Sequence, residues 1–248
     1  MTLEGRWANE LTEWDIVKVS DDFTAGTLST LNWQTQLTDT GTAAIATGAS
    51  YSNGVLQILP SDASVGNNDE AYVATLNPLF LPLLDNPIYF RCLLQYAEAN
   101  TSDFNVGMGL QSTFGQNMLI DDGGGPQACT TGILIYKVDG GTNWQVQARN
   151  GSEVYTNTTL SPAGDATAGD AGYHLFEIFV HRFGAARVQV LYKMDGNFLK
   201  DQVTNKTVIH SLLVAAAAPC YGVVLCKNGS AGPVQTVNVD RLHMQRLR

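Results

Sequence analysis

The sequence has 248 residues and a formal net charge of −9 at pH 7, with only 15% of its residues charged. So acidic a chain does not fit a nucleic-acid binder, which needs a basic surface to displace counterions from phosphate, and it disfavours adhesion to anionic membranes. Hydrophobic residues make up 44% of the chain, enough for a sizeable core. No apolar run approaches the ~20 residues that span a bilayer.

The first twenty residues differ in pattern from the rest of the chain. Leu3, Trp7, Leu11 and Trp14 recur at helical spacing, which predicts an apolar stripe on a short helix. The stripe fits either packing on the chain's own body or docking on a neighbouring subunit. The stretch has neither a basic start nor an apolar h-region, so we expect no signal peptide. We divide the chain into an N-terminal arm, residues 1–20, and a single domain, residues 21–248.

From Asp21 onward the pattern is that of β-strands. Short apolar or alternating runs are separated by turn signals such as Asn53-Gly54 and Asp139-Gly140, and there is no long helical pattern. This arrangement is typical of an antiparallel sandwich or jelly roll. Outside the hairpin described below, the expected strands span residues 31–37, 55–59, 70–76, 88–96, 104–110, 132–138, 144–149, 199–203, 207–214, 221–227 and 234–244.

Two segments interrupt this rhythm. Residues 77–86 carry Pro78 and Pro82 among several leucines, and proline removes the donors that a sheet needs, so we expect an apolar loop. The loop either caps the end of the core or presents a contact surface. Residues 160–172 are rich in Ala, Gly and Asp and indicate a flexible excursion.

The longest alternating stretch is Tyr173–Leu199. Phe176, Ile178 and Val180 alternate with the residues between them, which is the period of a pleated strand. A second alternating run follows a turn at residues 182–187. Asp195-Gly196 then predicts a tight hairpin turn, because this turn needs positive φ, which glycine adopts without steric cost.

This stretch resembles the concanavalin A-like lectin/glucanase superfamily. The resemblance is carried by an H-x-F-E-I strand, a turn and V-x-V-L-Y-x-x-D-G-N-x-L, and it is supported by Asp22-Phe23, by residues 54–58 and 87–95, and by the closing strand at residues 239–242. It implies two antiparallel sheets stacked face to face, one of them curved. The predicted fold is therefore all-β, an antiparallel β-sandwich of the concanavalin A-like jelly-roll type, with a short N-terminal helical arm. One fold hosts many functions, so the resemblance implies no particular activity.

The hydrolases of that superfamily carry paired carboxylates spaced E-x-D-x-x-E on one strand. The nearest match here begins at Glu13 and ends in Lys18, where the second acid belongs. Glu177 has no second acid two or four residues away, which predicts a solvated strand position. Lyases of similar fold need a Gln-x-His strand, and Ile209-His210 does not match it. We therefore predict no catalytic residue and a chain that is not an enzyme.

No metal or cofactor is expected, because the four cysteines and four histidines lack the spacing of a zinc site. We expect the cysteines to be reduced. Asp121-Asp122 and residues 67–70 offer oxygen ligands for calcium, although ordinary turn roles explain the same residues. Trp33 and Trp144 fit either stacking on sugars or burial in the core. The basic tail, which contains Arg241 and His243, fits either a solvated terminal strand or a docking end.

The leading hypothesis is a virion structural protein, because the richness in Asn, Gln, Thr and Gly resembles bacteriophage virion proteins. Specifically, we predict a capsid decoration (cement) protein that binds the major capsid protein, is made in the host cytoplasm and is located in the virion. The alternatives are a carbohydrate-binding lectin-like module or receptor-binding appendage with a glycan partner, and a divergent glycoside hydrolase. A homo-oligomer is also considered. The predicted partner-binding residues are Leu3, Trp7, Leu11, Trp14, Leu79, Phe80, Leu81, Arg246 and Arg248.

Overall fold

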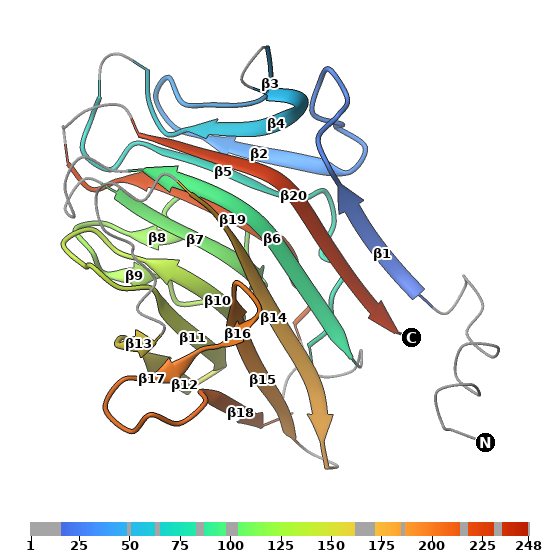
Figure 1. Cartoon of the computed structure of the whole chain (residues 1–248), viewed down its shortest axis with the longest axis vertical. Coiled ribbons are helices and arrows are strands. Elements are labelled where there is room, and N and C mark those ends of the chain that lie inside the picture. The colour runs from blue at the N-terminus through green and yellow to red at the C-terminus, as the bar shows by residue number, and fades with distance from the viewer. Residues whose placement is uncertain are drawn as a thin grey trace.

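A computed structural model describes residues 16–48, 51–62, 65–82, 87–97, 104–161, 172–184, 187–213, 218–230 and 235–247. Within these ranges the regular elements are β-strands, and most belong to two large antiparallel sheets that lie face to face (Figure 1). The predicted all-β antiparallel sandwich is confirmed. The predicted N-terminal helix lies outside the described residues. No helix in the described ranges is long and apolar enough to cross a membrane.

The sheet nearer the viewer in Figure 1 is called the front sheet, and the other the back sheet. In order, the front sheet contains β16 (Asn197–Phe198), β15 (Arg187–Met194), β14 (Tyr173–Phe183), β6 (Ile88–Ala97), β20 (Thr236–Leu247), β4 (Tyr51–Leu59) and β3 (Thr42–Gly48), with β1 (Ile16–Asp21) paired to β20 and β18 (Ile209–Leu213) paired to β15. The back sheet contains β12 (Glu153–Asn157), β11 (Gln145–Asn150), β10 (Thr131–Lys137), β7 (Phe104–Gln111), β19 (Tyr221–Asn228), β5 (Glu70–Thr75) and β2 (Trp33–Leu37).

The hairpin predicted at Tyr173–Leu199 is confirmed. β14 and β15 pair antiparallel, and β15 then turns into β16, where Lys193 lies opposite Phe198. Asp195 and Gly196 both have positive φ, 50° and 79°, the backbone that such a turn requires. The other edge of β14 pairs with β6, so the hairpin lies inside the front sheet.

β1 occupies residues that the sequence analysis assigned to the arm. It pairs along its whole length with β20, and Val19 packs against the core. The physical reason is alternation: Val17 and Val19 are partly buried, whereas Lys18 and Ser20 are exposed. The short run lacks the dense apolar pattern of the other strands, and a helical spacing precedes it.

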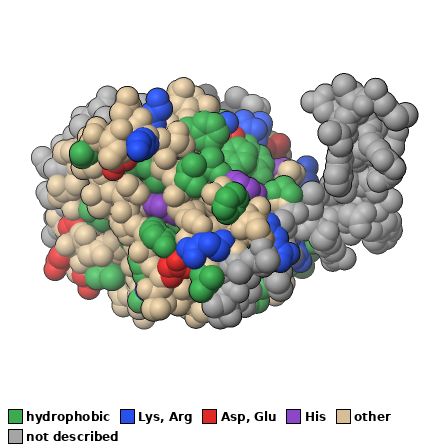
Figure 2. Space-filling view, turned by 90° about the horizontal axis from the view of Figure 1, so that it is seen from below, with side chains coloured by type: hydrophobic (Ala, Val, Ile, Leu, Met, Phe, Trp, Pro, Cys, Tyr) green, Lys and Arg blue, Asp and Glu red, His purple; other side chains and the backbone are tan. Residues whose placement is uncertain are grey.

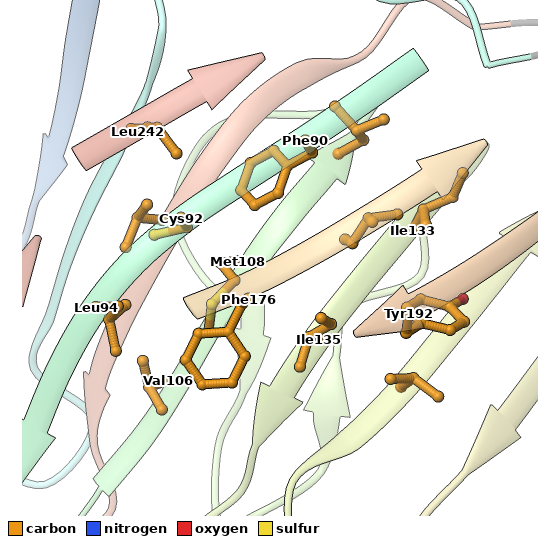
Figure 3. Packing of buried hydrophobic residues seen from close by; sticks show 14 of the residues in the cluster. Phe90, Cys92, Leu94, Val106, Met108, Ile133, Ile135, Phe176, Tyr192 and Leu242 are labelled. Carbon is orange, nitrogen blue, oxygen red and sulfur yellow. The ribbon is translucent and has the colours of Figure 1, made fainter. Parts of the chain in front are cut away.

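The two sheets bury a continuous hydrophobic core between them (Figure 3). Trp144 lies within it, with its ring centroid 4.5 Å from that of Phe176 and 5.4 Å from that of Tyr96. Trp144 is 1% exposed and Trp33 is 2% exposed. Neither tryptophan is therefore a surface ring for stacking on sugars, and of the two alternatives core burial is the correct one.

The outer face of the back sheet is covered by the chain itself. Residues 112–130, with the short hairpin of β8 (Leu119–Ile120) and β9 (Gly125–Pro126), link β7 to β10, and Met118 and Leu119 join a second hydrophobic cluster on that face. The buried Lys227 amine donates to Asn117 Oδ1 at 3.1 Å and to the Leu119 carbonyl at 3.0 Å. The outer face of the front sheet has no such strand cover among the described residues, and it is the face on which a ligand site is sought.

Candidate functional site

The outward side chains of the front sheet form two rows across its strands. Inward residues of the same strands fill the core, so the outward ones are those left for solvent or a ligand. The pairing registers place the rows side by side. The first row is Ser20, His243, Arg91, Glu177, Lys193 and Phe198; the second is Lys18, Gln245, Tyr89, Phe179, Leu191 and Ile209.

Three aromatic rings of these rows form what we call the aromatic platform: Tyr89, Phe179 and Phe198. The rings of Tyr89 and Phe179 stack with centroids 4.8 Å apart. Lys193 links the platform, because its amine lies 5.3 Å from the Phe179 ring and 4.5 Å from the Phe198 ring. Phe198 is 42% exposed. Figure 2 shows the end of the molecule that lies at the bottom of Figure 1, where hydrophobic side chains lie beside histidine, Lys and Arg.

Glu177 supports the platform from within the sheet. It is 8% exposed and accepts a short hydrogen bond from the Tyr89 hydroxyl. Burial, together with this carboxylate, raises the pKa of Tyr89 to about 12. The prediction of a solvated Glu177 is therefore wrong, because Tyr89 covers the carboxylate from the neighbouring strand. The bond holds the Tyr89 ring in place.

Beside the platform lies a cavity of about 420 Å³, here called the basic pocket. Its lining comes from β1 and the residue after it, from β6 and from β20: Ser20, Asp22, Tyr89, Arg91, Arg241 and His243. The Tyr89 ring is shared with the platform, so the two features are continuous. Burial, with the nearby charges of Lys18 and Arg91, lowers the pKa of His243 below its ordinary value, against the opposing effect of its hydrogen bond to Gln245.

A ladder of amide side chains crosses the same face on three adjacent strands. Gln57 donates to Asn238 Oδ1 at 3.3 Å, and Asn238 donates to Gln95 Oε1 at 3.0 Å. Amides both donate and accept, as sugar hydroxyls do. The open face therefore combines aromatic rings, amides and cationic side chains.

The structure brings none of the predicted partner-binding residues into this face as a group. Leu3, Trp7, Leu11, Trp14 and Arg248 lie outside the described residues. Leu79 and Leu81 are half-buried, and Phe80 is fully buried in the core, with its backbone paired to Cys220. Arg246 is half-buried on β20 opposite Ile88. Their role in binding a partner stays a prediction.

The sequence analysis missed Tyr89 and Arg91, and it left Arg241 and His243 open between a solvated strand and a docking end. Alternation does mark all four as outward residues of predicted strands. What it does not show is that β6 and β20 are neighbours, because they lie far apart in the sequence.

The residues considered as calcium ligands have other partners. Glu70 accepts hydrogen bonds from Tyr72 and from the Asn117 backbone, and Asp121 forms an ion pair with Lys227. Asn67 donates to Asp122 Oδ1 at 3.5 Å. Within the described ranges no group of three or more His, Cys, Asp or Glu side chains is arranged to hold a metal ion. All four cysteines are unpaired thiols.

A second pocket, of about 270 Å³, lies on the other side of the hairpin and includes Asn157 and Ile209 in its lining. The neighbouring His210 is buried, with Nε2 2.8 Å from Asn157 Oδ1 and Nδ1 3.0 Å from the Tyr192 hydroxyl. These partners assign the proton of the neutral ring to Nε2, since an amide oxygen only accepts. Burial lowers the pKa of His210 to about 4.

We predict that protonation of the buried His210 lowers the free energy of unfolding in acid. Because the pKa of His210 is lower in the folded state than in the unfolded state, this loss is absent above the unfolded pKa of about 6.5 and grows as the pH falls. It reaches its full size, roughly 3 kcal/mol, below the folded-state pKa of about 4. Urea unfolding of the wild type and of His210→Asn between pH 7 and 4 measures it. The stability advantage of the wild type should shrink over this window. His181→Asn is the control for loss of an imidazole, and a pH-independent difference for His210→Asn would contradict the assignment.

The sandwich architecture is shared with solved structures of other proteins. No family model matches the sequence, and no curated protein matches it. The solved structures that do match include three that share the fold almost end to end. The Emp47p carbohydrate recognition domain has a TM-score of 0.58 at 8% identity, covering 96% of this chain and 100% of that one.

The other two structures are proteins that act on glycans. A GH16 protein of Bacteroides ovatus in complex with a G4G4G3G product has a TM-score of 0.53 at 10% identity, covering 90% of this chain and 98% of that one. A structure from work on endo-acting O-glycanases of the human gut microbiota, which initiate mucin breakdown, has a TM-score of 0.55 at 12% identity, covering 93% and 99%. At such identities the likeness shows the fold.

These structures correct one prediction. The chain was expected not to be an enzyme, because it lacks the E-x-D-x-x-E pattern. The same fold carries glycan-cleaving proteins among its neighbours, so neither the fold nor the missing pattern excludes catalysis, and that prediction is withdrawn. Catalysis is open for this chain.

Proposed function

We propose that this protein binds a glycan across the open face of the front sheet. The observation that carries the proposal is the aromatic platform of Tyr89, Phe179 and Phe198. It shares a sheet face with amide and charged side chains, and no strand among the described residues covers that face. Sugar rings have apolar C–H faces that pack on aromatic rings, while their hydroxyls need donors and acceptors. Ligand sites in general combine aromatic walls with a few polar groups that set orientation.

The comparisons support the proposal at the level of the fold. The architecture is shared by a carbohydrate recognition domain and by glycan-cleaving proteins, so a sandwich of this shape suits either binding alone or binding followed by cleavage. We therefore pair the binding measurement with a search for released reducing ends.

Removing a platform ring should weaken glycan binding. A glycan array with labelled protein identifies a ligand, and calorimetry then measures its affinity. Phe198→Ala and Phe179→Ala should each lower that affinity about tenfold, the loss expected when a packed aromatic anchor is truncated. Leu31→Ala removes an equally apolar side chain, 83% exposed, before β2 of the back sheet, and serves as the control.

Two results would contradict the proposal. One is an array on which no glycan binds the folded protein. The other is wild-type affinity in both platform variants, with melting temperatures that show them to be folded. Phe198 is the more exposed of the two rings, so its removal should change the stability of the fold least. A loss of affinity in Phe198→Ala is therefore the clearer sign of a lost ligand contact.

We retain capsid decoration, and with it a virion location, as a second proposal. It is favoured by the apolar stripe of Leu3, Trp7, Leu11 and Trp14 and by the Asn-, Gln-, Thr- and Gly-rich composition. A glycan-binding sandwich carried on a particle would join the two proposals in one protein. The stripe precedes Ile16, where β1 begins, so an arm could be removed without touching a described strand.

A further inference from the structure

The basic pocket is large enough to hold part of a saccharide, and it lies next to the platform. Its volume of about 420 Å³ falls within the range of small-molecule pockets in proteins, about 300–1,000 Å³. Tyr89 forms part of both the pocket and the platform. Arg91 follows two residues later on the same face of β6, about 7 Å along the strand. A saccharide lying on the platform therefore brings a substituent of its ring or of the next ring to Arg91.

Among the described residues, the two arginines of the pocket have no carboxylate partner. In the described part of the chain neither Arg91 nor Arg241 forms an ion pair, although the chain carries a net charge of −9. The Arg91 Nε is buried without a hydrogen-bond partner. Glu177 lies opposite Arg91 in the register, but it accepts the Tyr89 hydroxyl. Asp22 is the carboxylate in the lining, and it is exposed.

A buried Arg91 Nε without an acceptor costs free energy as long as the pocket holds no ligand. A buried donor without an acceptor loses its hydration with nothing in exchange, which is why unsatisfied buried polar groups are rare in native proteins. The best acceptor for the N–H groups of an arginine is a planar or tetrahedral oxyanion, because it accepts two parallel hydrogen bonds from the guanidinium group.

We propose that the basic pocket binds an anionic group of a saccharide, a uronate carboxylate or a sulfate ester, so that the open face recognises acidic glycans. This inference rests on the proposed glycan-binding function and specifies its ligand class. Arg91 supplies the buried donor, Arg241 adds a second guanidinium at the rim, and the platform holds the sugar ring.

The groups around His243 make the binding dependent on pH. His243 faces Arg91 and the Tyr89 ring on β6, and Lys18 and Ser20 on β1, with Glu177 one strand beyond. Gln245 and Arg241 lie on its own strand, and the carboxylate of Asp22 lines the same pocket. Burial, and to a smaller extent the nearby cations Lys18 and Arg91, lower the pKa of His243 and so disfavour its protonated form in the free protein. A bound anion offsets those cations, so the complex takes up a proton more readily, and affinity for an anionic ligand should rise as the pH falls from 7.5 towards 5.5.

The test compares ligands that differ only in charge. Calorimetry measures binding of an oligogalacturonate and of its methyl ester, and of a carrageenan oligosaccharide and its desulfated form, to the full chain. At least one acidic member should bind tenfold or more tightly than its neutral partner, and which pair shows the difference identifies carboxylate or sulfate. Arg91→Gln should abolish that preference by lowering the affinity of the acidic member to that of its neutral partner. Lys206→Gln, an exposed cation in the second pocket, should keep the preference.

The outcomes separate this inference from the function on which it rests. Equal binding of charged and neutral partners in both pairs, with both weakened by Phe198→Ala, would leave glycan binding intact and overturn the acidic specificity. Binding of none of these four saccharides, nor of any glycan on an array, would overturn both. Arg91→Gln that weakens charged and neutral members equally would make Arg91 a structural residue and contradict the subsite. His243→Gln should remove the rise of affinity in acid but keep the charge preference at pH 7.5.

Discussion

Replacing Lys227 with alanine is expected to lower the free energy of unfolding by about 3–5 kcal/mol. The amine is fully buried under the β8–β9 segment, 3.6 Å from Glu70 Oε2, paired with Asp121 and bonded to the Leu119 carbonyl. Its loss leaves Glu70, 1% exposed, without a counter-charge. Urea unfolding followed by circular dichroism measures the change. Limited proteolysis should show new cleavage between residues 112 and 127, because the amine holds that segment on the back sheet.

Two further variants distinguish a buried charge from simple loss of contacts. Lys206→Ala removes an exposed lysine and should change stability by no more than about 0.5 kcal/mol. Lys227→Met combined with Glu70→Gln removes both charges and should cost less than Lys227→Ala alone. A double variant that is less stable than the single one would show that the ion pair is not the source of the loss.

Replacing Phe176 with alanine is expected to lower the free energy of unfolding by a similar amount, about 3–5 kcal/mol. The ring is fully buried between the sheets, with its centroid 4.5 Å from that of Trp144. Figure 3 shows it near Val106 and Met108 of the back sheet. Truncation loses the burial of the ring and leaves a cavity that the flanking strands close only in part. Thermal and urea unfolding both measure the change.

Phe183 provides the matched control on the same strand. It is 58% exposed at the end of β14, so Phe183→Ala should cost less than about 0.5 kcal/mol. If the two variants were equally stable, Phe176 would not be part of the core as described. A large loss of free energy of unfolding in Phe183→Ala alone would mean that this ring makes a stabilising contact that is not seen among the described residues.

Much of the sandwich follows from local chemistry. The alternation in β14 and β15 and the Asp195-Gly196 turn are properties of neighbouring residues, and they are recognisable without knowing what the strands pack against. β1, β3 and β12 were missed because they are short runs with few bulky apolar residues. Each of them is defined by its pairing with a neighbouring strand, β1 with β20, β3 with β4 and β12 with β11.

Glu177 is a residue whose environment could not be predicted from its neighbours in the sequence. On an outward strand position a lone acid predicts solvation, yet Tyr89, 88 residues away in sequence, buries it and donates a hydrogen bond to it. Arg91 shows the reverse, because a position in an apolar run turned out to carry a buried and unpartnered donor. In both residues the environment comes from the adjacent strand and not from the sequence neighbours.

The sequence by itself determined the all-β class, the central hairpin and the acidic, charge-poor surface, since each depends on composition or on contacts a few residues apart. The tertiary structure alone decided which outward residues meet. β1, β20 and β6 come from the two ends and the middle of the chain, and their pairing builds the basic pocket and joins it to the platform. Strand order is set by the burial of whole sheets, a non-local free energy that no short motif records.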